Sequence, residues 1–533
     1  MWRSAFVHVV LLVLLGPTCM HAQGVQLVED IWPGGIGSLP GFIGQLHGKV
    51  LFHAQTNEDR DEPYISDGTP EGTFQLADLN EQPIIGNSNV RGGYTYNDQF
   101  YFFARCRPDN SLQLCRTDGT VEGTGIFLDV PLMPGGHIAR GPFVEFNGAL
   151  YFLHTALNNS VQGAGLWTTD GTAQGTHMVS TDWRIYEGPP ASLVVHDDHL
   201  WFASFGNPSL HTLYKMDAAG TLEPVFTPQI LTSRISRIIP AATGLYFVLD
   251  QQLWWTDGTP VGTLQLTDLD GQGVFGFTQS HYTYYAVVGD TLYFCAGDAA
   301  NGQEPWRSDG TVAGTFQLAD IRPGTDHSTP ANFFKHGDNV YFTAWGGPGL
   351  LDVLCRTDGT PAGTVVLDSL DYLELRGPHN GALYAIGGSP AQVHVLDETT
   401  GQLVRVTGAT GADPCTWVCD MAWGEAGLFL CASTPDVDEE LFLFAEPVGM
   451  DQPAELPMLS IYPNPVGQVL QVVVPTNAQG VVTYAVHDIL GKRLLQGTLD
   501  NAAQIAVGGL ANGVYNLTIH GGGQRQAVQF VKE

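Results

Sequence analysis

The sequence predicts an all-β protein, a single large β-propeller of repeated units followed by a small C-terminal β-sandwich. Three observations support this prediction: a β-rich segment recurs nine times, a turn of the form DGTxxGT recurs beside it, and residues 458–533 follow a different strand pattern. No apolar helical period is visible after residue 22. Repetition is expected where one unit cannot bury its own apolar face and needs neighbours to cover it.

The N-terminus predicts export. Arg3 precedes a mostly apolar run, residues 5–15, which Gly16 and Pro17 end. This pattern is typical of a secretory signal peptide, here residues 1–22, and its apolar run is too short to span a bilayer. A signal anchor is the alternative, but Gly16 and Pro17 would stop its helix early. No later segment is an uninterrupted apolar run of about 18 residues, so we expect no transmembrane segment.

The charge excludes some partners. The chain carries 54 acidic and 22 basic residues, a formal net charge of −32. Such a surface repels phosphate backbones and anionic lipid, so we expect no binding to nucleic acid or to membrane surfaces. Distributed acidic residues also keep an exported protein soluble, and that simpler role is sufficient to explain them.

Nine repeat units share a β-rich run such as GKVLFHA or GDNVYFTA, in which Val, Tyr, Phe and Trp lie between Gly, Asn and Asp turns. This composition predicts strands. Successive units are 43 to 50 residues apart, measured on one shared column: Phe52, Phe102, Phe152, Phe202, Phe247, Phe294, Phe342, Ala385 and Leu430. Such regular spacing predicts one structural unit repeated along the chain.

A second strand and then a DGT turn follow each run. Asp accepts backbone N–H bonds in such a turn, Gly supplies positive φ, and Thr restarts the strand. We therefore expect a structural role for the six turn aspartates: Asp67, Asp118, Asp170, Asp257, Asp309 and Asp358. Two further elements per unit complete four antiparallel strands, as in a propeller blade.

The two ends of the repeat region, residues 23–448, predict how the ring closes. Residues 25–35 resemble a fourth strand without the preceding three, whereas the last unit, residues 415–448, has three strands and no fourth. We expect the N-terminal strand to complete the last blade, which protects both sheet edges. Nine blades exceed the usual four to eight, so eight blades and a split into two smaller rings remain alternatives.

These turns resemble the ELWxxDGT repeats of large secreted bacterial proteins. The match covers six units, is eroded at residues 215–221 and 395–402, and is missing in the last unit. The resemblance implies a propeller-like fold and assigns no activity.

The segment after the predicted linker, residues 449–457, forms a separate predicted domain, residues 458–533. It resembles the C-terminal sorting domain of the type IX secretion system of Bacteroidota through YPNP, DILGK, LANGVY and the terminal VKE. The resemblance implies that a type IX translocon recognises this domain and carries the protein out of the cell or to its surface. The residues that carry it are Tyr462, Pro463, Asn464, Pro465, Gly491, Lys492, Gly513 and Tyr515.

Seven of the eight cysteines lie after the signal peptide, where disulfides persist. Cys106 and Cys115 flank a polar turn, and so do Cys419 and Cys431. Each pair could therefore bridge a hairpin, although buried free cysteines are the alternative.

The sequence contains no strong catalytic or metal motif. Asn57, Asp59 and Asp61 alternate as calcium ligands do, but the glycine and glutamate of a full loop are missing. A solvated hairpin tip is the better interpretation, so calcium is a weak candidate and we predict no cofactor or metal. The HDDH stretch, residues 196–199, falls in a tight turn.

These features favour a secreted or cell-surface protein without enzymatic activity, which binds or adheres to an extracellular carbohydrate or protein. The alternative is a propeller-based hydrolase or lyase that acts on a polysaccharide or peptide with residues gathered from several blades. No local motif decides between them, and no catalytic residue is predicted.

Overall fold

The computed structural model describes the strands and turns of two units. It covers residues 25–34, 36–56, 61–79, 88–106, 112–128, 143–154, 165–179, 193–205, 211–230, 233–270, 273–274, 284–347, 351–407, 415–444, 460–462, 466–473, 482–488, 493–499, 504–521 and 524–532. Contacts divide the chain into two compact units, 1–446 and 447–533. The predicted signal peptide and linker lie outside the described residues. In the part that is described, no helix is long and apolar enough to cross a membrane.

The first unit is a nine-bladed β-propeller, so the prediction of nine blades is confirmed and the alternatives are excluded. In most blades the four strands pair in chain order. Blade 1 is β2 (Gly41–Leu46), β3 (Lys49–Ala54), β4 (Glu62–Ser66) and β5 (Phe74–Gln75); blade 2 is β6 (Arg91–Tyr96), β7 (Gln99–Arg105), β8 (Leu112–Thr117) and β9 (Gly125–Leu128); blade 3 is β10 (Phe143–Phe146), β11 (Ala149–His154), β12 (Gly165–Thr169) and β13 (His177–Met178).

The next three blades repeat this plan, with one addition in blade 6, where both β22 and β23 pair with β24. Blade 4 is β14 (Leu193–His196), β15 (His199–Phe205), β16 (His211–Met216) and β17 (Leu222–Phe226); blade 5 is β18 (Ile235–Pro240), β19 (Leu245–Leu249), β20 (Gln252–Thr256) and β21 (Leu264–Gln265); blade 6 is β22 (Gly273–Val274), β23 (Tyr285–Val288), β24 (Thr291–Asp298), β25 (Gly302–Ser308) and β26 (Phe316–Gln317).

The last blade differs because its fourth strand comes from the other end of the repeat region. Blade 7 is β27 (Ala331–His336), β28 (Asn339–Trp345), β29 (Asp352–Thr357) and β30 (Val365–Leu370); blade 8 is β31 (Glu374–His379), β32 (Ala382–Gly387), β33 (Gln392–Asp397) and β34 (Gln402–Arg405); blade 9 is β35 (Trp417–Gly424), β36 (Gly427–Ser433), β37 (Glu440–Phe444) and β1 (Val25–Glu29).

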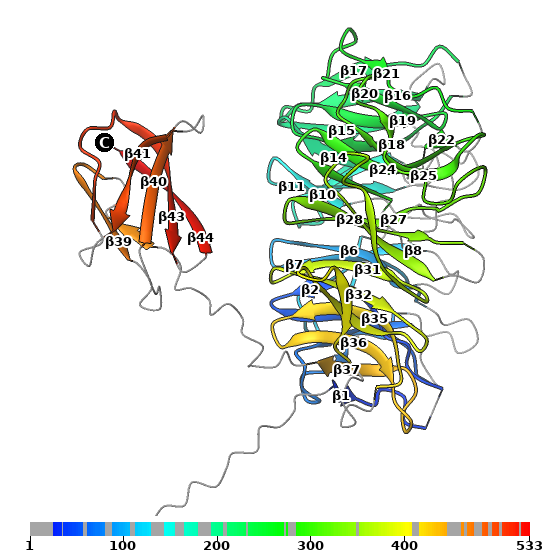
Figure 1. The fold of residues 1–533 in the computed structure, drawn as a ribbon. Coiled ribbons are helices and arrows are strands. Elements are labelled where there is room, and N and C mark those ends of the chain that lie inside the picture. The colour runs from blue at the N-terminus through cyan, green and yellow to red at the C-terminus, as the bar shows by residue number, and fades with distance from the viewer. Residues whose placement is uncertain are drawn as a thin grey trace, which may run out of the picture. The chain divides into compact units, whose positions relative to one another are not determined.

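Ring closure follows the prediction. Strand β1 pairs antiparallel with β37, with Val25 opposite Phe444 and Leu27 opposite Phe442. Figure 1 shows β1 in blue beside β37 in yellow, although they come from opposite ends of the repeat region. Val28 packs in one cluster with Phe52 of blade 1, so the closing strand also joins blade 9 to blade 1. The sheet edge that would otherwise expose backbone groups is thereby paired.

The propeller core lies between the blades. All nine residues of the repeated column lie on second strands and are at most 1% exposed. They pack mainly in clusters that join neighbouring sheets, for example Phe202 with Phe146 and Leu193. Because a single sheet of four short strands cannot bury such a side chain on both sides, the column recurs in every blade.

Every blade contributes two of its connections between strands to each face of the ring. Turns between first and second strands, and DGT turns between third and fourth strands, lie on one face, which we call the turn face. Because neighbouring strands are antiparallel, the connections between second and third strands and those between blades lie on the other, the loop face. The loop face therefore holds the starts of the first and third strands and the ends of the second.

The second unit is a small sandwich of two sheets. One sheet is β38 (Ser460–Tyr462), β39 (Val469–Val473) and β42 (Gln504–Ala506), and the other is β41 (Arg493–Leu499), β40 (Val482–Asp488), β43 (Gly513–Gly521) and β44 (Gln524–Lys532). Both contribute to one core, in which Leu470 of the first sheet meets Leu517 and Phe530 of the second.

Candidate functional site: two hollows of the ring

The DGT turn is held together by its own side chains. In blade 6, Asp309 Oδ1 accepts bonds from the Thr311 backbone N–H (3.1 Å) and hydroxyl (2.7 Å), and Thr311 Oγ1 accepts the Gly314 N–H (3.0 Å). The threonine hydroxyl lowers the pKa of the aspartate, which favours its charged form. The same bonds and the same direction of pKa change occur in the other five turns, at Asp67, Asp118, Asp170, Asp257 and Asp358.

The glycine of this turn lies against the preceding blade. Gly310 has φ +84°, and a Cβ there would be 3.1 Å from the Trp255 ring of blade 5. The Gly359 carbonyl of blade 7 likewise accepts a bond from Arg307 of blade 6 at 3.1 Å. The turn is thus a joint between blades, which explains why it is repeated and favours a structural role over a ligand contact.

A buried glutamate forms a second joint, on the loop face. Glu304, five residues before Asp309, accepts bonds from the backbone of Ile321 (2.9 Å) and Arg322 (3.3 Å) and from the Ser328 hydroxyl (2.7 Å) in the connection to blade 7. Burial raises the pKa of Glu304 to about 7. Glu62 with Ser88, and Glu440 with Ser38, repeat this pair.

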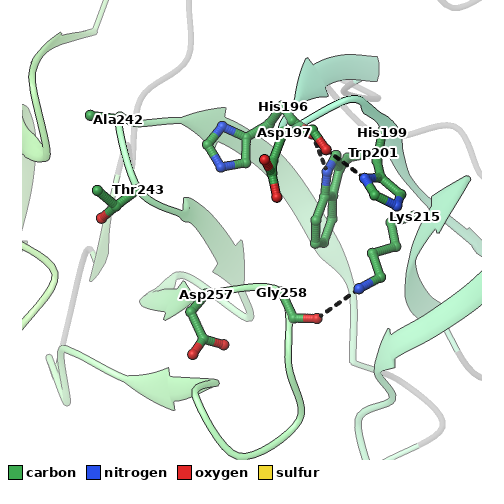
Figure 2. Close-up of a pocket in the computed structure, with 9 residues that line it drawn as sticks. All are labelled: His196, Asp197, His199, Trp201, Lys215, Ala242, Thr243, Asp257 and Gly258. Carbon is green, nitrogen blue, oxygen red and sulfur yellow. Dashed lines mark hydrogen bonds between the residues drawn. The ribbon is translucent and has the colours of Figure 1, made fainter. Parts of the chain in front are cut away.

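One hollow, the turn-face hollow, lies between blades 4 and 5 and has a volume of about 310 Å³. Figure 2 shows that Trp201, His199 and Lys215 bond to backbone oxygens of other residues that line it. The Trp201 indole donates to His196 O (3.1 Å), and Lys215 donates to Gly258 O (3.2 Å). The residues lining it are His196, Asp197, His199, Trp201, Lys215, Ala242, Thr243, Asp257 and Gly258.

The HDDH stretch contributes to this hollow without forming a metal site. His199 Nδ1 is 2.5 Å from Asp197 O within the tight turn between β14 and β15. Lys215 also pairs with Glu223 at 3.2 Å. Among the described residues, no three His, Cys, Asp or Glu side chains are placed to hold a metal ion. The turn-face hollow is therefore the internally bonded junction of two blades.

A second hollow, the loop-face hollow, lies where blades 6, 7 and 8 meet and has a volume of about 380 Å³. The starts of β25, β27 and β29 and the end of β28 form its wall. Its size falls within the range of small-molecule sites, roughly 300–1,000 Å³. The residues lining it are Tyr284, Cys295, Gln303, Thr329, Ala331, Asn332, Thr343, Ala344, Trp345, Asp352 and Leu373.

Gln303 distinguishes the loop-face hollow from the other. Its side chain is 1% exposed, and its Nε2 has no hydrogen-bond partner among the described residues. A buried donor without a partner costs about 1–3 kcal/mol. Its backbone, in contrast, is fully engaged, because N donates to His327 Nδ1 at 2.9 Å and O accepts from Ser328 N at 2.9 Å. The fold therefore holds this amide in place while leaving its side-chain donor unsatisfied.

Asn332 contributes a second amide from an unusual backbone position. It lies in a bulge of β27 with φ +55°, where the corresponding bulge of blade 2 has Gly92 with φ +44°. Its Nδ2 makes only a long bond of 3.4 Å to Thr343 Oγ1. Thr329 also has a positive φ, of +42°. Leu39, at the entry to blade 1, has a positive φ as well, so the backbone strain at Thr329 is a feature of the repeated unit and not of this hollow. Asn332, by contrast, places a polar side chain in the hollow at a bulge position where blade 2 has a glycine without a side chain.

Trp345 and Asp352 complete the loop-face hollow. Trp345 is 39% exposed, and the Arg322 guanidinium lies 4.1 Å from its ring centroid. Arg322 is held by Asp326 at 2.8 Å. Asp352 Oδ2 accepts the Leu373 N–H at 3.0 Å, and burial raises the pKa of Asp352. The hollow therefore offers an indole surface beside amide donors and a carboxyl acceptor.

The loop-face hollow contains a thiol that is not activated. Burial raises the pKa of Cys295 far above its ordinary value, so the group stays protonated and is a poor nucleophile. Sequence reasoning did not identify any of the residues of this hollow. Trp345 carried the one visible signal, because it is an aromatic side chain at a strand end where most equivalent units, for example at Gln55, Arg105 and Gly297, have none.

Several predicted site residues lie outside the described residues, and the structure shows the contacts of the others. Asn57 and Asp59 are outside, whereas Asp61 Oδ1 pairs with His53 Nδ1. The calcium assignment therefore rests on sequence alone. In the tail, Pro463, Asn464, Pro465, Gly491 and Lys492 are outside, Tyr462 ends β38, and Gly513 begins β43. Tyr515 OH donates to Ala511 O at 2.8 Å, which fixes the LANGVY segment.

The two predicted cysteine pairs differ. Cys419 and Cys431, on neighbouring strands of blade 9, form a disulfide with an S–S distance of 1.93 Å. Cys106 and Cys115 are free cysteines, although their sulfur atoms are 3.0 Å apart. Burial raises the pKa of Cys115 well above its ordinary value, which keeps its thiol protonated.

The comparison with protein families identifies the tail. Residues 460–533 match the secretion system C-terminal sorting domain. This match supports the type IX assignment and indicates secretion across the outer membrane through interaction with that machinery. No curated protein matches the chain.

Solved structures resemble the chain only distantly. A puromycin hydrolase is 12% identical over 68% of this chain and 61% of its own, with a TM-score of 0.38. A prolyl endopeptidase is 10% identical over 70% of this chain and 55% of its own, also with a TM-score of 0.38, so the chain spans less than two thirds of either protein. The extracellular domain of a putative hybrid two-component system from B. thetaiotaomicron is 10% identical over 95% of this chain and 93% of its own, with a TM-score of 0.27. Scores this low leave function to be inferred from the chain's own residues.

Proposed function

We propose that this protein is an extracellular binding module without enzymatic activity. In this proposal, residues 1–22 direct the chain to the periplasm and the tail directs it across the outer membrane. The propeller then holds a ligand in the loop-face hollow.

One observation carries the binding proposal: Gln303 Nε2 is buried, lacks a partner among the described residues and lines the same hollow as the exposed Trp345. Natural proteins rarely leave a buried donor unsatisfied, and a ligand acceptor is one reason to do so. The loop face also suits recognition, because beside the repeated Glu–Ser pairs its strand ends carry residues such as Trp345 that differ from the equivalent Gln55 and Arg105.

The residues of this hollow favour binding over chemistry. Its titratable groups are Asp352, which is held by the Leu373 backbone, the tyrosine Tyr284, and the protonated thiol of Cys295. Besides burial, the nearby Glu304 carboxylate raises the pKa of Cys295 further and is already bonded to Ile321 and Ser328, so it does not activate the thiol. The alternative of a hydrolase or lyase would need a base and a nucleophile within hydrogen-bond reach of one substrate.

Binding is tested on the purified protein with arrays of glycans and of extracellular proteins, comparing the wild type with Gln303→Met. Methionine has a similar length but no donor, so we expect at least a tenfold loss of signal with the fold intact. Mass spectrometry of the bound molecules should show no change in their mass. Turnover of any of them, or equal binding by both proteins, contradicts the proposal.

Export is tested separately by truncation after residue 455. We expect the shortened protein in the periplasm and the complete protein in the medium or on the cell surface. Arrival of the shortened protein outside the cell would remove the role assigned to the tail.

A further inference from the structure

We infer that the loop-face hollow takes a neutral sugar ring, through one aromatic surface and a mixed set of donors and acceptors. This inference rests on the proposed function, because it names the class of ligand for the same site.

The first step concerns the indole of Trp345. It remains 39% exposed although Arg322 stacks on it, and Arg322 is itself fixed by Asp326 and by His327 O, at 2.8 and 3.0 Å. The ring is therefore held before a ligand arrives, which lowers the entropic cost of binding. A rigid indole offers a flat apolar surface that suits the C–H face of a sugar.

The second step concerns hydrogen bonding. Gln303 Nε2 can only donate, and the Asp352 carboxylate can only accept. A hydroxyl group does both, so neighbouring hydroxyls on one ring can accept from the amide and donate to the carboxylate. Asn332 adds an amide whose bond to Thr343 is long, at 3.4 Å, and therefore easily exchanged. The set of groups matches a polyol better than a ligand that only accepts or only donates.

The third step concerns charge. Asp352 lines the hollow, and the nearby guanidinium of Arg322 is already paired with Asp326. The chain as a whole carries −32. An anionic ligand would meet this carboxylate and a repulsive field, whereas an ammonium group placed beside Gln303 could not accept its hydrogen bond. An uncharged ligand avoids both costs.

The test measures binding of glucose, galactose, mannose and xylose to the purified protein by saturation-transfer NMR and titration. Glucuronate, galacturonate and glucosamine serve as charged counterparts of similar shape. We expect at least one neutral sugar to bind at least tenfold more tightly than its charged counterparts. Gln303→Met and Trp345→Ala should each weaken that binding at least tenfold.

Thr168→Val is the matched control. Thr168 is 8% exposed in blade 3 and its hydroxyl, like the Gln303 amide, has no partner among the described residues, but it does not line the hollow. We expect this variant to bind the sugar like the wild type. Gln303→Met should melt no lower than the wild type, because it removes an unsatisfied donor.

Two outcomes separate this inference from the proposed function. If charged sugars or proteins bind as well as neutral sugars, and Gln303→Met still abolishes their binding, the ligand class is wrong and the binding function stands. If no tested molecule depends on Gln303 and Trp345, both are wrong.

Discussion

The two hollows are similar in size, about 310 and 380 Å³, yet only one of them is a candidate ligand site. At the turn-face hollow, Lys215 is bonded to Gly258 and Glu223, so its cation is already used within the protein. At the loop-face hollow, the Gln303 side chain is only 1% exposed, and its Nε2 has no hydrogen-bond partner among the described residues. Hydrogen-bond satisfaction, more than volume, therefore separates a junction between blades from a site that can recognise a ligand.

The largest expected effect comes from opening the ring, on which both hollows depend. Deletion of residues 25–35 removes β1, including Val25 and Val28, which are 5% and 4% exposed. Their burial alone contributes about 3–6 kcal/mol. We expect a sharply lower melting temperature and loss of ligand binding, measured by calorimetry and by titration. Unchanged melting would show that the closing strand is dispensable and that the ring is held by the blade contacts alone.

The pH dependence of stability tests Glu304, the buried glutamate next to the loop-face hollow. The pKa of this group rises from an ordinary value of 4.5 to about 7 in the folded protein, so the native state binds its proton more tightly than the unfolded chain. This tighter proton binding by Glu304 contributes at most about 3 kcal/mol to the free energy of unfolding. The contribution is fully present below pH 4.5 and is lost as the pH rises to 7. Glu304→Gln cannot titrate. Chemical denaturation at several pH values should show that the advantage of the wild type over this variant shrinks as the pH rises between these limits, and a constant difference would contradict it.

A substitution on the turn face tests whether that face is only structural. Gly310→Val places a β-branched residue at φ +84° and a Cβ 3.1 Å from the Trp255 ring. We expect a loss of about 1–3 kcal/mol with unchanged ligand affinity. Val312→Ala, at a 59% exposed position of the same turn, is the control and should cost almost nothing. Loss of binding without loss of stability would instead make the turn face a contact surface.

The smallest expected effect is that of removing the tail. The two units have separate cores, so truncation after residue 455 should leave the propeller's melting transition within about 1 °C of its original temperature, by calorimetry. Ligand affinity should not change either. A collapse of that transition would make the second unit a structural cap instead of a sorting domain.

The sequence predicted the propeller well because its signals are local and repeated. The column from Phe52 to Leu430 marked every second strand, and the unmatched segments at both ends indicated how the ring closes. The HDDH stretch was correctly placed in a tight turn, because its histidines flank two residues with positive φ, Asp197 and Asp198.

The candidate site could not be predicted in the same way. Gln303 and Asp352 are 49 positions apart and meet only because blades 6 and 7 are neighbours. Gln303 Nε2 lacks a hydrogen-bond partner among the described residues because of the groups that surround it in the fold, and a local sequence pattern does not reveal those groups. Glu304 shows the same limit, since its place five residues before the turn aspartate Asp309 does not reveal its bond to Ser328 in the connection to the next blade.

The pairing of β1 with β37 also determines when the ring can be completed. The partners Val25 and Phe444 are 419 positions apart, so the first strand of the propeller to be synthesised is the last to find its place. Contacts of such long range slow folding, because the loop must close before they contribute any stability. Until residue 444 is available, β1 has no partner and the nascent chain carries an open strand edge that can pair with another chain. Chaperones or rapid completion of the chain would matter most during that interval.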